Sequence, residues 1–314
     1  FMSMPTTRRH VLRTLAAATG ASALPQSVLA GSAPKPLPLA CNQYPWHTFY
    51  QREGRNWAAN PDASLAELAA SGLKGYEPIF TSAAEVKTLL PLLTKHGLAM
   101  HSLYVNSTLH RADEAEKSLE SVLAIAEAAR PAGTRIIVTN PSPIRWGGPE
   151  NKSDAELTEQ ARNLDRLGAE LKKHGLTLAY HTHDVELREA AREFHHMLLA
   201  TDPARVALCL DAHWVYRGAG NSQVALFDVV KLYGRRVVEI HLRQSIDGVW
   251  GETFGEGDID YARLATDLQR QGVRPHLVLE QCIEKASPHT LNGVEAHQRD
   301  LAYASGLFRK WLTG

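Results

Sequence analysis

Four side chains that can bind a metal ion recur at a regular interval in the second half of the 314-residue chain. His181 and Asp211 are 30 residues apart, Asp211 and His241 are again 30 apart, and Glu280 follows 39 residues after His241. Imidazole nitrogens and carboxylate oxygens that converge on one point bind a divalent ion, and a set without thiolate is not typical of structural zinc. We therefore expect one divalent metal ion, with Mn²⁺ preferred and Co²⁺, Fe²⁺, Zn²⁺ and Mg²⁺ as alternatives.

The stretch LAYHTHDVE, residues 178–186, contains two histidines that could provide the first of these ligands. Side chains alternate along a strand, so His181 and His183 are expected on the same face. We expect one of them to be a ligand and the other to contact substrate or to support the ligand. His181 is favoured as the ligand, and His183 stays the alternative. Glu186, at the end of the stretch, is a candidate for binding the substrate.

The elements that would position these residues alternate along the chain. Strand-like apolar runs are expected at residues 37–44, 73–80, 99–106, 135–140, 176–183, 206–213, 237–242 and 276–281. Helical patterns are expected at residues 62–71, 82–96, 113–130, 153–174, 187–200, 222–233, 258–272 and 293–312. This alternation predicts an α/β fold, a single (β/α)₈ TIM barrel over residues 31–314. A doubly wound open sheet is the alternative, but no G-x-G-x-x-G loop follows the first strand.

The barrel prediction also explains the interval between the candidate ligands. In TIM barrels the chemistry lies at the C-terminal ends of the strands. Each of the four candidates lies near the C-terminal end of one predicted strand of the second half, at the same place on its strand. We therefore expect their side chains to meet at one mouth of the barrel.

Residues 1–30 have the composition of an export signal. Phe1 precedes Met2 and is expected to be a cloning remnant. Arg8 and Arg9 are followed by a weakly apolar run and by a small-residue ending at residue 30. This order is typical of a signal peptide, and the paired arginines are typical of the twin-arginine pathway, with an ordinary Sec signal as the alternative. We expect a bacterial protein that the twin-arginine export machinery delivers to the periplasm or beyond.

The overall charge and the cysteines limit the possible partners. Lys plus Arg and Asp plus Glu both number 34, so no net charge attracts the chain to nucleic acid. The apolar run of the signal is too short for stable membrane insertion. Cys209 and Cys282 fall on predicted strands six and eight, and two strand spacings of about 4.8 Å exceed the limit of about 7 Å for a disulfide. We expect these two and Cys41 to be free thiols.

Five motifs occur in a fixed order along the chain, namely YHTHDVE, CLDAHWVYRGAG, EIHLRQ, FGEGDIDY and VLEQ. Together they resemble the xylose-isomerase-like TIM-barrel family of sugar isomerases and epimerases, from about residue 37 to the C-terminus. The resemblance implies that His181, Asp211, His241 and Glu280 hold one divalent metal ion. In ketose epimerases the first position is usually glutamate. The YHxHD form resembles instead the branch with inosose dehydratase and enzymes that eliminate across 3-keto-glycosides.

The resemblance also implies the type of reaction. The metal would polarise a sugar carbonyl, so that a neighbouring C–H becomes acidic. Returning the proton gives epimerisation or isomerisation, whereas expelling a β-substituent gives elimination. We expect Glu280 or His213 to be the base, and His183 or Glu77, at the second strand end, to be the opposing acid. Arg243, where many relatives have lysine, could bind a hydroxyl or carboxylate of the substrate.

Other candidates for substrate contacts lie on loops. Glu256 stands between two glycines in FGEGD, on a loop that could cover the site. Trp214, like Trp46, Trp146 and Trp250, lies near a predicted strand end and could stack on a sugar ring or pack in the core.

We therefore expect a metal-dependent isomerase or epimerase for an unphosphorylated sugar or keto-sugar, because exported proteins do not meet cytoplasmic sugar phosphates. A lyase acting on a 3-keto-glycoside or inosose is the first alternative. An exported sugar-binding protein without catalysis is the second. An endonuclease-IV-like phosphodiesterase is the third, although it would require more ligands in the first half of the chain. The oligomeric state stays open.

Overall fold

Eight parallel strands form the centre of the computed structural model, which describes residues 37–313. The signal peptide expected at residues 1–30 lies outside the described residues. The barrel strands are β1 (Ala40–Asn42), β2 (Gly75–Glu77), β3 (Ser102–Ser107), β4 (Ile136–Pro141), β5 (Thr177–Tyr180), β6 (Val206–Asp211), β7 (Val237–Leu242) and β10 (His276–Leu279). Six of the eight fall within the predicted runs, and β3 and β4 each extend one residue beyond them, which confirms the α/β barrel.

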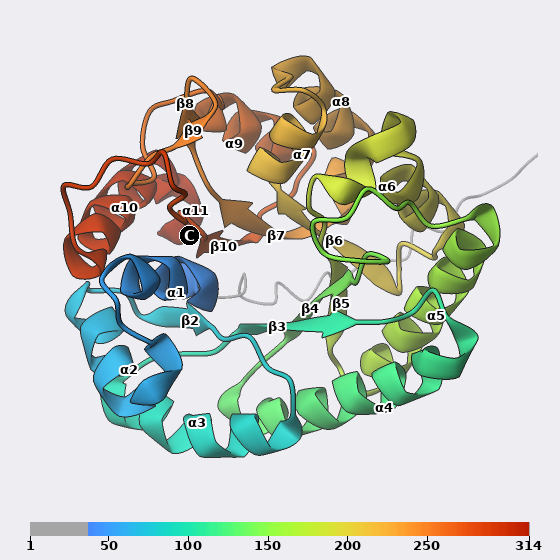
Figure 1. Cartoon of the computed structure of the whole chain (residues 1–314), viewed down its shortest axis with the longest axis horizontal. Coiled ribbons are helices and arrows are strands. Elements are labelled where there is room, and N and C mark those ends of the chain that lie inside the picture. The colour runs from blue at the N-terminus through green and yellow to red at the C-terminus, as the bar shows by residue number, and fades with distance from the viewer. Residues whose placement is uncertain (1–36, 314) are drawn as a thin grey trace, which may run out of the picture. The chain divides into compact units, whose positions relative to one another are not determined.

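Helices surround the strands (Figure 1). Their bounds are α1 (Gln43–Arg52), α2 (Pro61–Ala70), α3 (Ala83–His96), α4 (Ala112–Ala129), α5 (Asp154–Lys173), α6 (Arg188–Ala200), α7 (Ala212–Gly218), α8 (Gln223–Tyr233), α9 (Tyr261–Arg270), α10 (Gly293–Leu307) and α11 (Arg309–Leu312). Short 3₁₀ helices are η1 (Trp57–Ala59), η2 (Arg130–Ala132), η3 (Val185–Leu187) and η4 (Gly234–Arg236). No helix within residues 37–313 combines the length and the apolar character needed to cross a membrane.

The strands pair in the order β2-β1-β10-β7-β6-β5-β4-β3. Between the two outer strands, β2 and β3, only isolated parallel bridges occur, Gly75 with Ala99 and Ile79 with Tyr104. The Tyr104 amide donates to the Pro78 carbonyl at 2.9 Å there. The ring is therefore closed at this seam by isolated bridges rather than by a continuous ladder.

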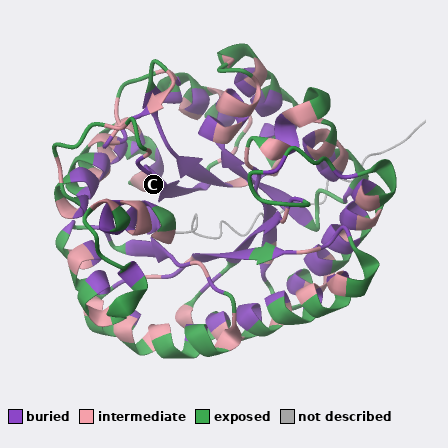
Figure 2. Cartoon of the chain, viewed as in Figure 1, coloured by how far each residue is buried: buried purple, intermediate pink, exposed green. Residues whose placement is uncertain are grey.

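Local sequence explains where the helices begin and end. Ser153 caps α5: its hydroxyl oxygen accepts the Glu156 backbone N–H. The Glu156 carboxylate in turn accepts the Ser153 backbone N–H, which completes a capping box. Leu164 and Leu171 lie on the buried face of this helix, as the period of 3.6 residues requires. Helix α3 ends at Gly97, whose φ of 65° is a left-handed conformation that glycine adopts without strain. Helix faces of this kind pack onto strands that are buried along almost their whole length (Figure 2).

Five strands (β1, β2, β5, β6 and β10) end two or three residues before their predicted ends. The expected strand 37–44 stops at Asn42, and the expected strand 206–213 stops at Asp211. In both cases the side chain of the last strand residue accepts a hydrogen bond from a backbone amide two or three residues later and thereby starts a helix, α1 or α7. The expected strand 176–183 stops at Tyr180. The hairpin of β8 (Ser245–Ile246) and β9 (Val249–Trp250) was not predicted.

The cysteine prediction is confirmed. Cys41, Cys209 and Cys282 are buried, and all three are free thiols.

Candidate functional site

The four predicted ligands come together at the C-terminal ends of four neighbouring strands. Asp211 ends β6, His241 lies in β7, and His181 and Glu280 directly follow β5 and β10. Asp211 and His241 are register partners in the sheet. All four are buried, and one nitrogen or oxygen of each lies within 4.8 Å of the others. Sequence spacing alone had indicated this convergence.

Three atoms of the group, namely His181 Nε2, Asp211 Oδ2 and His241 Nε2, lack the hydrogen-bond partner that a buried polar atom needs. His181 Nε2 and Asp211 Oδ2 lie 3.8 Å apart, and neither has a hydrogen bond. Leaving such atoms unpaired in the interior costs free energy. The space between His181 Nε2 and Asp211 Oδ2 is therefore a position where a further group would bind. A divalent cation fits this position, because the surrounding donors are imidazole nitrogens and carboxylate oxygens.

The charges around the group also favour a cation. The pKa of Glu280 is lowered to about 2, because Arg243 and His241 outweigh the effect of burial. The pKa of Asp211 is lowered because Arg243 and His181 outweigh burial in the same way. The pKa of His241 is raised well above its usual value, because Cys209, Glu77 and Glu280 outweigh burial. A proton or a metal ion at this position is therefore stabilised by ionised carboxylates.

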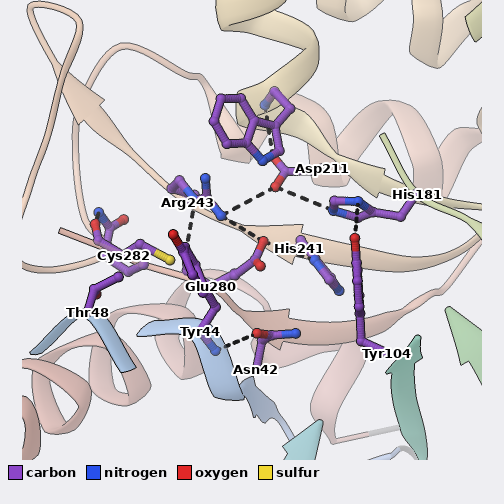
Figure 3. A network of polar contacts seen from close by, with 12 residues as sticks. Asn42, Tyr44, Thr48, Tyr104, His181, Asp211, His241, Arg243, Glu280 and Cys282 are labelled. Carbon is purple, nitrogen blue, oxygen red and sulfur yellow. Dashed lines mark hydrogen bonds and ion pairs between the residues drawn. The ribbon is translucent and has the colours of Figure 1, made fainter. Parts of the chain in front are cut away.

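Arg243 connects two of the candidate ligands (Figure 3). Its Nη2 lies 2.8 Å from Glu280 Oε2 and 3.8 Å from Asp211 Oδ2. The guanidinium is 1% exposed and stands 5.0 Å and 4.5 Å from the ring centroids of Trp214 and Trp250. Its Nη1 has no hydrogen-bond partner. One donor of this buried cation is thus free for a substrate oxygen.

Tyr104, on β3, was not predicted as a site residue. Its hydroxyl lies 3.3 Å from His181 Nδ1, which leaves His181 Nε2 to face Asp211 (Figure 3). Its position near the C-terminal end of the third predicted strand was the only sequence signal that could have identified it.

A pocket of about 510 Å³ opens beside the four-residue group. Pockets of this size, within the range of roughly 300 to 1,000 Å³, bind small organic molecules. Its aromatic lining consists of Tyr44, Tyr104, Trp146, Trp214 and Trp250. Its polar and charged lining consists of Asn42, Asn106, Arg145, His183, Asp184, Arg188, Arg243 and Glu280. Sugars present both apolar C–H faces and hydroxyls, which suits this mixture.

His183 lies in the pocket, whereas His181 belongs to the four-residue group. The two ring centroids are 5.0 Å apart. The rings of Trp146 and Trp214 lie 5.1 Å and 5.4 Å from His183, and its Nδ1 has no hydrogen-bond partner. Burial and the neighbouring His181 lower the pKa of His183 well below its usual value, so it stays neutral at neutral pH. A neutral imidazole with a free nitrogen can accept a proton.

Glu186 was predicted to bind substrate, but it lies behind the pocket. Its carboxylate accepts the His183 backbone N–H at 2.7 Å and the Asn140 side-chain amide at 3.1 Å. Asn140 also donates to the His181 carbonyl at 3.0 Å. Glu186 therefore holds the segment that carries both histidines and does not line the pocket.

His213 was expected on the same strand face as Asp211, as a possible base. Because β6 ends at Asp211, residue 213 lies in the first turn of α7 and is turned away from the pocket lining. Its Nε2 lies 3.1 Å from Ser245 Oγ, and burial followed by Arg243 lowers its pKa to about 3. This position does not support a role for His213 as the base.

Glu77 was expected as the opposing acid, but it is fully buried below the pocket. Its Oε1 lies 3.1 Å from His241 Nε2 and accepts the Asn42 side-chain amide at 2.6 Å. Glu239 lies beside it, 3.4 Å from the same nitrogen. Burial raises the pKa of Glu239 to about 8, with Glu77 contributing, while His241 outweighs burial and lowers the pKa of Glu77 to about 2. Neither carboxyl group lines the pocket.

Of the two residues predicted to contact substrate from loops, Glu256 and Trp214, only Trp214 lines the pocket. Glu256 is exposed and accepts a hydrogen bond from Tyr303 at 3.3 Å, outside the pocket. Trp214 lines the pocket as predicted, together with Trp146 and Trp250. Trp46 is fully buried in the core.

Comparison with known proteins places this geometry in context. The sequence model of the family described as xylose isomerase-like TIM barrel matches residues 65–305. The inosose dehydratase of Clostridium perfringens is 25% identical over 247 residues, which cover 69% of this chain and 80% of that protein. The inosose dehydratase of Mesomycoplasma hyopneumoniae is 24% identical over 275 residues, covering 78% and 88%.

Solved structures with this fold include sugar epimerases. D-allulose 3-epimerase from Methylomonas sp., in complex with D-allulose, has a TM-score of 0.66 at 15% identity and covers 87% of this chain and 98% of its own. A xylose isomerase-like TIM barrel protein from Mycobacterium smegmatis, in complex with magnesium, has a TM-score of 0.65 at 13% identity, covering 88% and 97%. At these identities the likeness establishes the fold.

Proposed function

Because the chain belongs to the xylose isomerase-like TIM barrel family, we propose that it is a divalent-metal-dependent lyase for an unphosphorylated keto-sugar or keto-cyclitol. The observation that carries this proposal is the position of His183. It places one neutral, unpaired imidazole in the pocket, beside the candidate metal group. The inosose dehydratases among the relatives support the same choice.

His181, Asp211, His241 and Glu280 would hold the ion, with Mn²⁺ preferred. When bound, the ion would supply Lewis acidity to a carbonyl in the pocket. Arg243 keeps Glu280 ionised and presents its free Nη1 toward the pocket, where it can donate to a substrate oxygen. The aromatic side chains exclude water and lie against the C–H faces of the ring.

His183 would carry the proton. Its free nitrogen takes the proton from the carbon next to the carbonyl, and the C–H electron pair forms the new C=C bond. The bond between the β-carbon and its oxygen breaks, and that oxygen leaves with the electron pair. The imidazolium of His183 then returns the proton to the leaving oxygen, so that water or an alcohol is released and His183 is neutral again.

Epimerisation is the second candidate function. It requires a second proton carrier on the opposite face of the carbon, and Glu280 is the carboxylate that lines the pocket beside the metal group. It is ion-paired with Arg243 and belongs to the candidate metal group, so it is less available as a proton carrier than the unpaired His183. We therefore place elimination first.

The test uses the Mn²⁺-loaded protein with a panel of inososes, ketoses and 3-keto-glycosides in D₂O. Elimination would yield a product lighter by one water or one alcohol, whereas epimerisation would yield a diastereomer with deuterium at the reacting carbon. NMR and mass spectrometry separate the two. If the metal-loaded protein gives neither elimination nor deuterium exchange on the panel, the catalytic proposal is wrong and a sugar-binding role takes its place.

A further inference from the structure

Two fully buried carboxyl groups lie beneath the candidate metal site, on the side away from the pocket. Glu77 ends β2 and Glu239 lies in β7, and both face the Nε2 atom of His241. Neither lines the pocket, so the proton transfer proposed above does not use them. Buried carboxyl groups are costly unless they are paired, which raises the question of what they do.

The two nitrogens of His241 face different surroundings. Nδ1 lies 3.0 Å from Glu280 Oε2, within the candidate metal group. Nε2 lies 3.1 Å from Glu77 Oε1, which is within donating distance, and it has no other hydrogen-bond partner. A neutral imidazole carries its proton on one nitrogen and offers a lone pair at the other. If Nε2–H donates to Glu77, the lone pair of Nδ1 points toward the other ligands.

Glu77 is held more firmly for this task than Glu239. Its Oε1 also accepts the Asn42 side-chain amide at 2.6 Å, which fixes this oxygen at 3.1 Å from His241 Nε2. Glu239 is farther from Nε2, at 3.4 Å, and its additional partner is the weak donor Cys209 Sγ at 3.6 Å. The geometry therefore distinguishes two carboxyl groups of the same type in one enclosure.

We propose that Glu77 is a positioning residue for the metal site: it accepts the Nε2–H of His241 and thereby fixes the tautomer and ring orientation that present Nδ1 to the ion. This proposal rests on the metal site of the proposed function. Partners that fix a ligating histidine in this way typically contribute about 10- to 100-fold to metal affinity.

The first test compares Mn²⁺ affinity of the full chain with that of Glu77→Gln and Glu239→Gln, by competition with a chelator. Glutamine has the shape of glutamate, so both variants keep the packing. We expect Glu77→Gln to bind Mn²⁺ about 10- to 100-fold more weakly, since a neutral amide is a poorer acceptor for Nε2–H. Glu239→Gln should change the affinity less than about threefold. Equal affinities of Glu77→Gln and wild type, or a larger loss in Glu239→Gln, would overturn the proposal.

A second measurement needs no substitution. In the Zn²⁺-loaded wild-type protein, ¹⁵N NMR distinguishes a protonated Nε2 from a protonated Nδ1 in His241. The proposal requires the proton on Nε2, and a proton on Nδ1 would contradict it. A wild-type protein that binds neither Mn²⁺ nor Zn²⁺ would remove the metal site itself and this inference with it. Intact metal binding without turnover would contradict only the proposed function.

Discussion

Arg243 and Glu280 are joined at two points, which makes the pair a rigid part of the pocket floor. Arg243 Nη2 lies 2.8 Å from Glu280 Oε2, and Arg243 Nε donates to the Glu280 carbonyl oxygen at 2.9 Å. Removing one partner of a buried ion pair leaves the other charge uncompensated.

We therefore expect Arg243→Met to destabilise the metal-free protein by roughly 3 to 5 kcal/mol. Mn²⁺ should raise the melting temperature of this variant more than that of wild type, because the ion supplies the positive charge that Glu280 and Asp211 have lost. Arg217→Met is the matched control. Arg217 pairs with Glu284 at 3.1 Å, but that pair is partly exposed and outside the ligand group. Thermal unfolding with and without Mn²⁺ tests this prediction. An equal rise in melting temperature for wild type and Arg243→Met would count against the proposed role of the pair.

Asp211→Asn should remove the metal and preserve the fold. Asp211 Oδ1 caps α7 through the Trp214 amide at 2.8 Å, and asparagine is an equally good cap. Oδ2 is the atom that would bind the ion, and in asparagine an uncharged NH₂ group takes the place of this oxygen. Metal analysis by mass spectrometry should fall from about one equivalent to below about 0.1, while the circular dichroism spectrum stays unchanged. The exposed Glu256→Gln should retain its metal, and metal retained in Asp211→Asn would exclude Asp211 as a ligand.

His183→Asn should retain the metal and lose turnover. Loss of a general acid or base typically costs about 10²- to 10⁴-fold in kcat, and KM should change little. The pKa of His183 is lowered well below its usual value by burial, so the group is already neutral, and able to accept a proton, above that pKa. Turnover should therefore show no acid limb near pH 6.5 from this residue. The exposed His174→Asn is the control, and full activity in His183→Asn would assign the proton transfer to another group.

Glu186 should make stability depend on pH. Burial and the charge of Glu193 raise its pKa from 4.5 to about 7. The folded state thus binds the proton more tightly than the unfolded state, so the resulting stabilisation is complete below pH 4.5 and is lost as the pH rises through 7. At about 1.4 kcal/mol per pH unit, wild type should lose up to roughly 3 kcal/mol across this interval. Urea unfolding should show no such decrease in Glu186→Gln, whereas the exposed Glu120→Gln should behave like wild type.

The fold was largely readable from the sequence because the strands are short apolar runs separated by amphipathic helices with clear caps. The predicted helices 82–96 and 153–174 differ from α3 and α5 by at most one residue at either end. The four-residue group was also readable, since all four residues lie at the C-terminal ends of predicted barrel strands, which meet at one mouth of the barrel. The positions of other site residues depended on where the strands end, which the sequence pattern did not give. Asp211 is both a candidate ligand and a helix cap, and the period of two therefore gave the wrong position for His213.

Contacts between distant strands could not be derived from spacing. Glu77 lies at a strand end, as the candidate ligands do, yet its side chain contacts His241, and only the packed barrel shows this. Tyr104 and Asn42 gave no chemical signal in the sequence, because tyrosine and asparagine at strand ends are common. Their importance comes from the atoms they meet, His181 Nδ1 and Glu77 Oε1.

The seam between β2 and β3 has a mechanical consequence. In the order of the ring, β6 and β7 lie diametrically across from it, and the four candidate ligands belong to β5, β6, β7 and β10. Local opening of a closed sheet is expected where the pairing of the strands is interrupted, so this barrel should open first between β2 and β3. Its amides there should exchange with solvent faster than those of β6 and β7. The part of the barrel that opens first is thus the part farthest from the candidate ligands. Local opening there should leave the four ligands in place relative to one another.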